Sequence, residues 1–450
     1  MDLFGTAGIR GDTRTRVTPE LALSVGRAAG LDGDEFVVGR DGRETGGALA
    51  AALEAGLTSA GASVRRLGVV PTPAVAFAAR DCRGAMLTAS HNPPTDNGIK
   101  LFSEGVEYDR EAERRIESRV AKGVDAESWD RWGTVEEWDV LPRYREAVAA
   151  YAEGLGSEPV GLRVAVDCGN GVAGLATPQV LRELGASVVT LNAQVDGHFP
   201  GRPSKPTEET LSDLGALVAN TGTELGIGHD GDADRIVILD SHGRIVHEDT
   251  VLAILAEHYT RHATAADPVV VTTPNASARI DERVETAGGR TERVRLGALH
   301  EGIARVYEGG GEETEVVFAA EPWKHIHTAF GGWIDGVASA AVLVRLVADA
   351  GGLGALREPI TERPYRKVAV ACPDERKEAV MESLEGSLPD TFPEASVDTD
   401  YGVRLEWPDA AWILVRPSGT EPYVRLYAES EDVDALIADA RAAIEREVGE

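Results

Sequence analysis

The stretch FVVGRDGRETGGALAAALEAGLTSAGASVRRLG, residues 36–68, contains two kinds of hydrophobic pattern in succession. The β-branched run at 36–39 predicts a buried strand. Leu49, Leu53 and Leu57 lie four residues apart, which places them on one face of a predicted helix, and Gly61 follows as a C-cap signal. A second strand is predicted at 65–68. Strand, helix and strand in this order indicate an α/β fold with a parallel sheet.

The same order of elements occurs twice more along the chain. Predicted strands at 163–167 and 186–191 flank a helix that ends at 181–185, and predicted strands at 269–273 and 293–297 flank a helix that ends at 284–289. Such repetition predicts three related α/β domains with mostly parallel sheets.

The C-terminal part follows a different pattern, typical of a smaller α+β domain. It is expected to contain strands at 365–371, 402–406, 411–415 and 423–427 and helices at 375–384 and 433–444. With boundaries near Pro142, His247 and Arg363, the predicted domains are 1–142, 143–247, 248–362 and 363–450. The acidic segment 125–139 is expected to be a surface connection.

Composition excludes several classes of protein. The chain has 450 residues, 45 Lys plus Arg and 75 Asp plus Glu, and a net charge of −30. This charge argues against binding to nucleic acid or to an anionic membrane surface. Six of the cations are lysines, so 39 are arginines, and an acidic, lysine-poor composition favours a protein from a salt-rich cell over an ordinary low-pI protein.

The expected cellular compartment follows from the patterns of export, membrane insertion and disulfide formation, none of which is found in the sequence. The start shows no signal-peptide pattern, and the longest strongly apolar stretch, 337–344, is too short to span a bilayer. No C-x-x-C pair occurs among the widely spaced cysteines, which are Cys82, Cys168 and Cys372. A cytoplasmic protein with reduced thiols is expected, either a monomer or a homodimer.

The motif TASHNPPTDNGIK, residues 88–100, should form a loop at the end of a strand, where open α/β sheets bind ligands. Ser90 is a possible nucleophile, with His91 beside it and Lys100 a loop away. The alternative is an ordinary polar turn, since neighbours in sequence rarely form a nucleophile–base pair.

The motif HDGDADR, residues 229–235, lies between two apolar runs and carries carboxylates at alternate positions, Asp230, Asp232 and Asp234. Their mutual repulsion favours a bound divalent cation, and Mg²⁺ prefers oxygen ligands. An EF-hand is excluded, because Arg235 replaces its glycine and Ser241 its final glutamate. A solvated acidic turn is the alternative.

The motif RPSGTEPYVR, residues 416–425, combines two hydroxyls, a glycine and two arginines in a loop between predicted strands. These groups suit a phosphate dianion, and arginine binds it with two donors. Unremarkable surface arginines are the alternative. Two weaker motifs are the glycine-rich start at 4–11 and the segment AEPWKH at 320–325, where Glu321 and His325 could bind sugar hydroxyls, move protons or form a structural ion pair.

Taken together, these motifs resemble those of the α-D-phosphohexomutase family, which includes phosphoglucomutase, phosphomannomutase and phosphoglucosamine mutase. The resemblance covers nearly the whole chain and implies three α/β domains and a fourth domain around a central cleft. It implies a phosphoserine at Ser90 and Mg²⁺ held by Ser90, Asp230, Asp232 and Asp234. It implies that Arg10, His91, Lys100 and Arg235 surround the transferring phosphate. It also implies substrate-binding roles for Glu321, His325, Arg416, Ser418, Gly419, Thr420 and Arg425.

Two departures from the family pattern concern the sugar. The usual Ser and Gly of the sugar loop are Trp323 and Lys324 here, which places the hexose preference in doubt. A histidine that some members carry after a glycine of the third domain has no clear match, since Ala298 follows Gly297.

The function implied is interconversion of hexose or hexosamine 6-phosphate and 1-phosphate, with Mg²⁺, phosphoserine 90 and a sugar bisphosphate intermediate. Glucose, mannose and glucosamine phosphates remain open as substrates. Two alternatives are a phosphoserine-dependent sugar phosphatase and a non-catalytic sugar-phosphate sensor. The intact Ser90 and aspartates argue against a sensor, and the second phosphate loop argues against a phosphatase.

Overall fold

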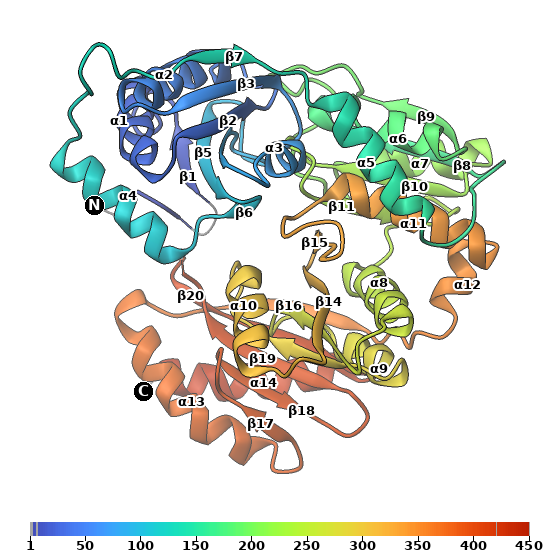
Figure 1. The fold of residues 1–450 in the computed structure, drawn as a ribbon. Coiled ribbons are helices and arrows are strands. Elements are labelled where there is room, and N and C mark those ends of the chain that lie inside the picture. The colour runs from blue at the N-terminus through green and yellow to red at the C-terminus, as the bar shows by residue number, and fades with distance from the viewer. Residues whose placement is uncertain (1–2, 6–7, 420, 450) are drawn as a thin grey trace. The chain divides into compact units, whose positions relative to one another are not determined.

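A computed structural model describes residues 3–5, 8–419 and 421–449 of the chain (Figure 1). It contains two compact units. The first consists of Met1–Val251 and Phe318–Arg357, and the second of Leu252–Val317 and Glu358–Glu450. The four-domain division expected from the sequence stays a prediction.

The first sheet of the first unit has seven strands in the order β1-β5-β4-β2-β3-β7, with β6 paired to β5. The strands β4, β2, β3 and β7 run parallel to one another, whereas β1 and β4 are antiparallel to β5. Their bounds are β1 Ile9–Asp12, β2 Glu35–Arg40, β3 Ser63–Val69, β4 Arg83–Leu87, β5 Asp96–Ser103, β6 Val106–Glu107 and β7 Val135–Glu137.

Helices cover both faces of this sheet because its central strands are apolar on both sides. Phe36 and Val38 belong to a core shared with two helices, α1 (Pro19–Ala29) and α2 (Gly46–Ser59). The backbone of Gly39 approaches α3 (Thr72–Ala78) so closely that a Cβ there would lie 2.5 Å from a Val75 methyl.

A second sheet follows, with the order β11-β10-β8-β9. The strands β9, β8 and β10 are parallel, and β11 returns antiparallel beside β10 as a hairpin. The bounds are β8 Arg163–Asp167, β9 Ser187–Leu191, β10 Leu225–His229 and β11 Ile236–Leu239. The remaining helices of this unit are α4 Arg110–Lys122, α5 Leu141–Glu153, α6 Thr177–Glu183, α7 Ser212–Thr221, α11 Gly336–Ala350 and α12 Leu353–Arg357.

The second unit holds most of a third sheet, ordered β13-β12-β14-β15, whose strand β14 continues into the first unit. The bounds are β12 Asp267–Thr272, β13 Arg290–Arg293, β14 Thr314–Glu321 and β15 Lys324–Ile326. Three helices accompany it, α8 Glu248–His262, which also crosses the boundary, α9 Ala278–Thr286 and α10 Leu299–Gly309.

An antiparallel sheet completes the second unit, in the order β16-β20-β19-β18-β17. The bounds are β16 Tyr365–Ala371, β17 Ser396–Asp398, β18 Val403–Glu406, β19 Trp412–Pro417 and β20 Tyr423–Glu429. One face packs on α13 (Lys377–Thr391) and α14 (Val433–Gly449) around a single apolar core.

The three predicted strand–helix–strand units are confirmed. Each forms a parallel pair with its helix between, namely β2-α2-β3, β8-α6-β9 and β12-α9-β13. The fold class is confirmed as well, with α/β domains and an antiparallel C-terminal domain.

Two predicted elements have other bounds. The strand expected at 293–297 lies earlier, as β13 at Arg290–Arg293, and the exposed connection at 125–139 includes the short strand β7. Both are edge strands with polar sequences, so hydrophobicity did not reveal β7 or the bounds of β13. The helix expected at 375–384 is α13, which continues to Thr391.

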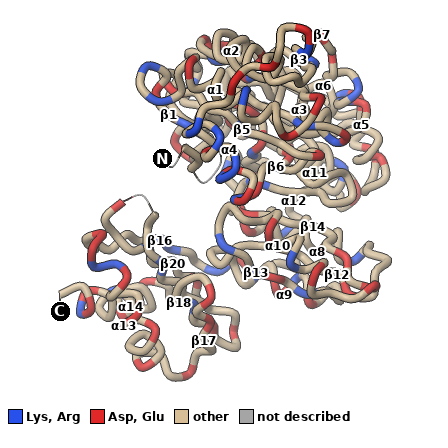
Figure 2. Tube along the Cα trace, turned by 60° about the vertical axis from the view of Figure 1, so that its left-hand side comes forward, with Lys and Arg blue, Asp and Glu red and all other residues tan. Residues whose placement is uncertain are grey.

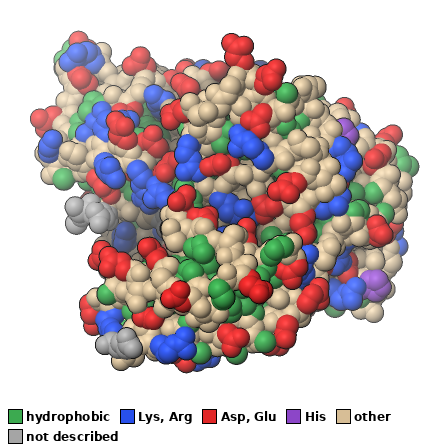
Figure 3. Space-filling model, turned by 90° about the horizontal axis from the view of Figure 1, so that it is seen from below, with side chains coloured by type: hydrophobic (Ala, Val, Ile, Leu, Met, Phe, Trp, Pro, Cys, Tyr) green, Lys and Arg blue, Asp and Glu red, His purple; other side chains and the backbone are tan. Residues whose placement is uncertain are grey.

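No helix in the described part of the chain is both long and apolar enough to cross a bilayer. Figure 2 shows Asp and Glu throughout each unit, with Lys and Arg between them, and the face in Figure 3 carries both signs with small apolar groups.

Candidate active site

Ser90 lies in the loop between β4 and β5, at the carboxyl end of a central strand of the first sheet. Its φ of 52° is left-handed, and its side chain is buried. Such a backbone costs roughly 1 kcal/mol for a residue with a Cβ, so the surroundings must hold it. The Arg43 guanidinium does so by donating to the carbonyl oxygens of Ser90, Asn92, Pro93 and Asp96.

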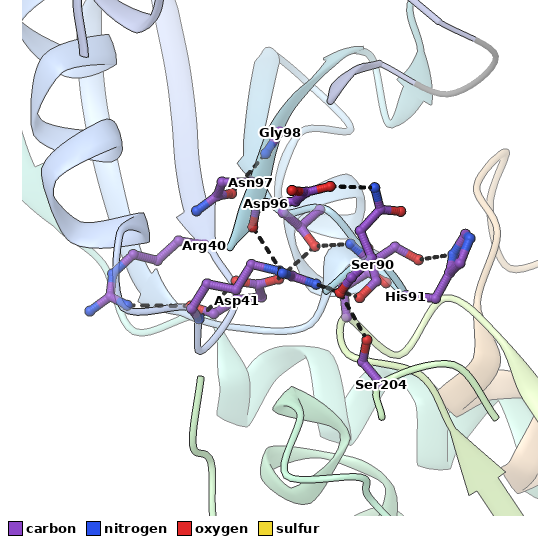
Figure 4. A network of polar contacts seen from close by, with 12 residues as sticks. Arg40, Asp41, Ser90, His91, Asp96, Asn97, Gly98 and Ser204 are labelled. Carbon is purple, nitrogen blue, oxygen red and sulfur yellow. Dashed lines mark hydrogen bonds and ion pairs between the residues drawn. The ribbon is translucent and has the colours of Figure 1, made fainter. Parts of the chain in front are cut away.

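A buried chain of contacts fixes this arginine in turn (Figure 4). Asp41 accepts from Arg43 Nε at 3.1 Å and from Thr88 Oγ1 at 2.7 Å, and Thr88 Oγ1 accepts from the Ser90 amide at 2.8 Å. Burial raises the pKa of Asp41 to about 6, although Arg43 opposes the shift. Asp41 and Arg43 are not among the residues predicted from the sequence, where their signal is an Asp-Gly-Arg directly after a buried strand.

The Ser90 hydroxyl points at two titratable groups. It donates to Asp230 Oδ2 at 2.6 Å, and its Oγ lies 3.2 Å from His91 Nδ1. Burial, then the charges of Arg235 and Arg10, lower the pKa of His91 to about 3. The imidazole is therefore neutral near pH 7.

The three aspartates of the turn between β10 and β11 lie together, as the sequence predicts. All three are buried, and one oxygen of each lies within 4.8 Å of the others. Gly231 is needed in this turn, because a Cβ would lie 2.6 Å from the Ser90 carbonyl oxygen. Burial, with the charges of Asp234 and Asp232, raises the pKa of Asp230 well above its usual value.

Cations face the same cluster. Lys100 Nζ lies 2.9 Å from Asp234 and 3.5 Å from Asp232, and Arg235 Nε lies 3.8 Å from Asp230. Burial alone would raise the pKa of Asp234, but Lys100, Lys324 and Arg235 outweigh it and hold that pKa far below its usual range.

Several polar atoms of the cluster remain unpaired. Asp232 Oδ1, Asp234 Oδ1, Arg235 Nε and Arg10 Nε are buried without a hydrogen-bond partner. Buried carboxylate oxygens of this kind are costly unless a cation meets them. Three converging carboxylates beside a serine hydroxyl fit a hard divalent cation such as Mg²⁺.

Thr72, at the start of α3, is a further residue of this cluster. Its Oγ1 donates to Asp232 Oδ2 at 2.7 Å, and its amide donates to the Asp232 carbonyl oxygen at 3.0 Å. The Pro71-Thr72-Pro73 sequence indicates only a helix start, so tertiary structure was needed to find it.

The segment around Glu321 is a tight hairpin between β14 and β15. Glu321 is the register partner of Lys324, and their side chains form an ion pair of 3.0 Å. The carbonyl oxygen of Trp323, at the tip, accepts from the Ile236 amide at 3.1 Å. This bond ties the hairpin to the end of the aspartate turn.

His325 is the register partner of Ala320, so strand alternation turns it away from the face of Glu321 and Lys324. Its Nδ1 lies 3.0 Å from Ser339 Oγ, and burial lowers its pKa to about 3. The structure therefore separates the two residues that the sequence analysis grouped. The binding role of His325 stays a prediction.

The Arg416 loop belongs to the second unit. Arg416 on β19 and Arg425 on β20 are register partners, so both side chains leave the same face of the sheet. Arg416 Nε and Ser418 Oγ are buried without a partner. Lys377 Nζ donates to the Ser418 carbonyl oxygen at 2.7 Å and thereby holds the loop. Gly419 follows in the loop, and the predicted Thr420 lies outside the described residues.

Comparisons with known proteins bear on this arrangement. Models of the phosphoglucomutase/phosphomannomutase family match more than half of the chain. The alpha/beta/alpha domain I matches residues 1–127, the alpha/beta/alpha domain II matches 142–243, and the C-terminal domain matches 368–447.

Two curated relatives are similar over nearly their whole length. A phosphopentomutase from Thermococcus kodakarensis is 43% identical over 96% of this chain and 94% of its own. A probable phosphoglucosamine mutase from Methanopyrus kandleri is 41% identical over 95% and 94%. Among solved structures, a phosphoglucomutase/phosphomannomutase family protein from Burkholderia thailandensis has a TM-score of 0.85 and 28% identity, over 99% of this chain and 96% of that one.

Proposed function

The chain belongs to the phosphoglucomutase/phosphomannomutase family of intramolecular phosphotransferases, and on this premise we propose that it interconverts sugar 1-phosphates and terminal-carbon phosphates through a phosphoserine at Ser90. The observation that carries the proposal is the position of the Ser90 hydroxyl, 2.6 Å from Asp230 and beside two further buried aspartates. A serine that only contacted solvent would not need three buried carboxylates beside its hydroxyl.

Asp230, Asp232 and Asp234, with an oxygen on Ser90, are the residues that would hold Mg²⁺. When bound, the ion supplies positive charge to the oxygens of the transferring group. The oxygens Asp232 Oδ1 and Asp234 Oδ1 support this assignment, since they are buried and accept no hydrogen bond from the described residues.

In the proposed first transfer, the free hydroxyl oxygen of the sugar monophosphate attacks phosphorus of phosphoserine 90. The bond between phosphorus and Ser90 Oγ breaks, and Oγ takes up a proton as the sugar hydroxyl loses one. The neutral imidazole of His91 lies close enough to Oγ to relay that proton. Arg10, Lys100 and Arg235 supply fixed positive charge, which is how proteins stabilise phosphoryl transfer.

The product of this step is a sugar bisphosphate. After it turns end for end, Ser90 Oγ loses its proton and attacks the other phosphate, the phosphorus–oxygen bond to the sugar breaks, the sugar oxygen takes up a proton, and the phosphoserine is regenerated. The atoms balance without water or a second donor. This scheme needs a second site for the phosphate that is not reacting, and we assign it to Arg416, Ser418, Gly419, Thr420 and Arg425.

The unpaired Arg416 Nε and Ser418 Oγ support the second phosphate site. Both are buried polar atoms in a cationic loop, and an anion with several oxygens would satisfy them. Glu321, at the end of β14, is the proposed partner of the sugar hydroxyls.

Hexose and hexosamine phosphates are the first substrate candidates. Pentose 1- and 5-phosphates are a second candidate, favoured by the name of the Thermococcus relative and by the bulk of Lys324 on the Glu321 face of the hairpin.

The test follows phosphorus by nuclear magnetic resonance during incubation with glucose, glucosamine and ribose 1-phosphates and Mg²⁺. A mutase converts at least one of them to its terminal phosphate without releasing inorganic phosphate. Release of inorganic phosphate would favour the phosphatase, and binding without conversion would favour the sensor.

A further inference from the structure

The hairpin of β14 and β15 places a lysine beside the carboxylate that is proposed to meet the sugar. Lys324 Nζ lies 3.0 Å from Glu321 Oε1, and both side chains are nearly buried, with exposed fractions of 14% and 13%. The two residues are register partners, so the backbone itself holds them side by side. This ion pair is built into the hairpin.

The hairpin is also tied to the end of the aspartate turn. The carbonyl oxygen of Trp323, which lies between the two residues in the sequence, accepts a hydrogen bond of 3.1 Å from the amide of Ile236, the first residue of β11. A substrate whose hydroxyl approaches Ser90 places its ring beside this turn, to which the hairpin of Lys324 is hydrogen-bonded.

An ammonium group on the sugar ring would be electrostatically disfavoured at this position. The hairpin carboxylate is already paired with Lys324, whereas Lys100 and Arg235 are paired with aspartates, so the charge that a ring ammonium would meet at the hairpin is that of Lys324. Like charges at short range in a partly buried site are strongly unfavourable. Hydroxyl groups, in contrast, can bond to both the carboxylate and the ammonium of the pair.

We propose that the Lys324–Glu321 pair selects sugar phosphates with an uncharged ring, hexose or pentose, and rejects amino sugars such as glucosamine phosphate. This inference rests on the proposed mutase function and specifies its substrate class. Lys324 is then the residue that determines specificity.

Glucose and glucosamine 1-phosphates provide the test, because they differ only in a hydroxyl or an ammonium at one carbon. We expect kcat/KM of the wild-type enzyme to be at least about tenfold higher for glucose 1-phosphate than for glucosamine 1-phosphate. Ribose 1-phosphate, measured in parallel, distinguishes a pentose from a hexose as the preferred neutral sugar.

Three variants assign the discrimination to the lysine. Lys324→Gln should reduce the preference for the neutral ring over glucosamine by about tenfold, because the repelling charge is gone. Lys324→Arg keeps the charge and should keep the preference. Lys122→Gln makes the same charge change on an exposed helix end and should leave the ratio unchanged.

The outcomes separate this inference from the function beneath it. A wild-type enzyme that isomerises glucosamine phosphate fastest removes the inference and leaves the mutase function intact. Equal losses for all sugars in Lys324→Gln also overturn it, since Lys324 would then only support the site. A wild-type enzyme that isomerises none of the three sugars removes both claims.

Discussion

The group of residues around Ser90, which includes Asp230, Asp232, Asp234 and the cations beside them, is rich in charge, and so is the Arg416 loop. The two sites differ in how that charge is balanced. Around Ser90, cations pair with buried carboxylates, such as Lys100 with Asp234 and Arg43 with Asp41, and the atoms left without a hydrogen bond include the carboxylate oxygens Asp232 Oδ1 and Asp234 Oδ1. In the Arg416 loop, the atoms left without a hydrogen bond are a guanidinium nitrogen and a hydroxyl, and both arginines donate to tyrosine hydroxyls. We therefore propose that the first site is completed by a cation and the second by an anion.

Removing the nucleophile should give the largest effect. Ser90→Ala should reduce mutase turnover by on the order of 10⁴-fold or more, because no phosphoenzyme can form. Intact mass should show one phosphate on part of the wild-type protein and none on the variant. Ser128→Ala, at an exposed serine of the same unit, is the control and should keep full turnover. Normal turnover in Ser90→Ala would end the phosphoserine mechanism.

The metal comes next in expected effect. Asp232→Asn removes one anionic ligand and should reduce turnover by roughly 100-fold or more and raise the Mg²⁺ concentration needed for activity. Chelation should silence the wild-type enzyme, and added Mg²⁺ should restore it. Asp125→Asn, on the exposed connection, should respond to Mg²⁺ as wild type does. Activity that ignores chelation would make the aspartates a structural cluster.

The Arg416 loop should give a smaller and more selective effect. Arg416→Lys keeps the charge but loses the paired donors, so kcat/KM for the sugar phosphate should fall by roughly 10- to 100-fold. Hydrolysis of phosphoserine 90 by water, without sugar, should hardly change, since no distal phosphate takes part. Arg366→Lys, exposed on the same sheet, is the matched control. If sugar turnover and hydrolysis of phosphoserine 90 by water fall together in Arg416→Lys, then Arg416 does not act on the distal phosphate alone.

Much of the fold and of the aspartate turn could be predicted from the sequence. The strand–helix–strand units were predictable because apolar runs, a helical face and a glycine cap occur together in residues 36–68. The aspartate turn was predictable because it stands between two apolar strands. The edge strand β7 and the bounds of β13 were not, because polar residues at a sheet edge carry no hydrophobic signal.

The residues that support the site were the hardest to foresee. Arg43, Thr72 and Lys324 act through contacts with residues far away in the sequence or across a hairpin whose register the sequence does not reveal. The separation of His325 from Glu321 has the same origin, because the faces of a strand are assigned only once its pairing is known.

The smallest expected effect is on the free energy of unfolding and comes from Asp41, which helps to support the Ser90 loop. The pKa of Asp41 is raised to about 6 by burial, so the folded protein binds a proton there more tightly than the unfolded chain. Stability from this group is present at low pH and lost as pH rises from about 4 through 6, by about 3 kcal/mol in all. Between pH 5 and 7 the loss should be about 1 kcal/mol.

Asp41→Asn isolates this contribution. The free energy of unfolding of wild type, minus that of the variant, should fall as pH rises from 5 to 7 in chemical denaturation. Asp281 in the second unit is the opposite case, because Arg293 overcomes burial and lowers its pKa. Its stabilisation is present above the unfolded pKa and is lost only in stronger acid, so the same difference for Asp281→Asn should stay level over this range. A level line for Asp41→Asn as well would mean that Arg43 keeps Asp41 ionised, and that the Ser90 loop rests on a full ion pair.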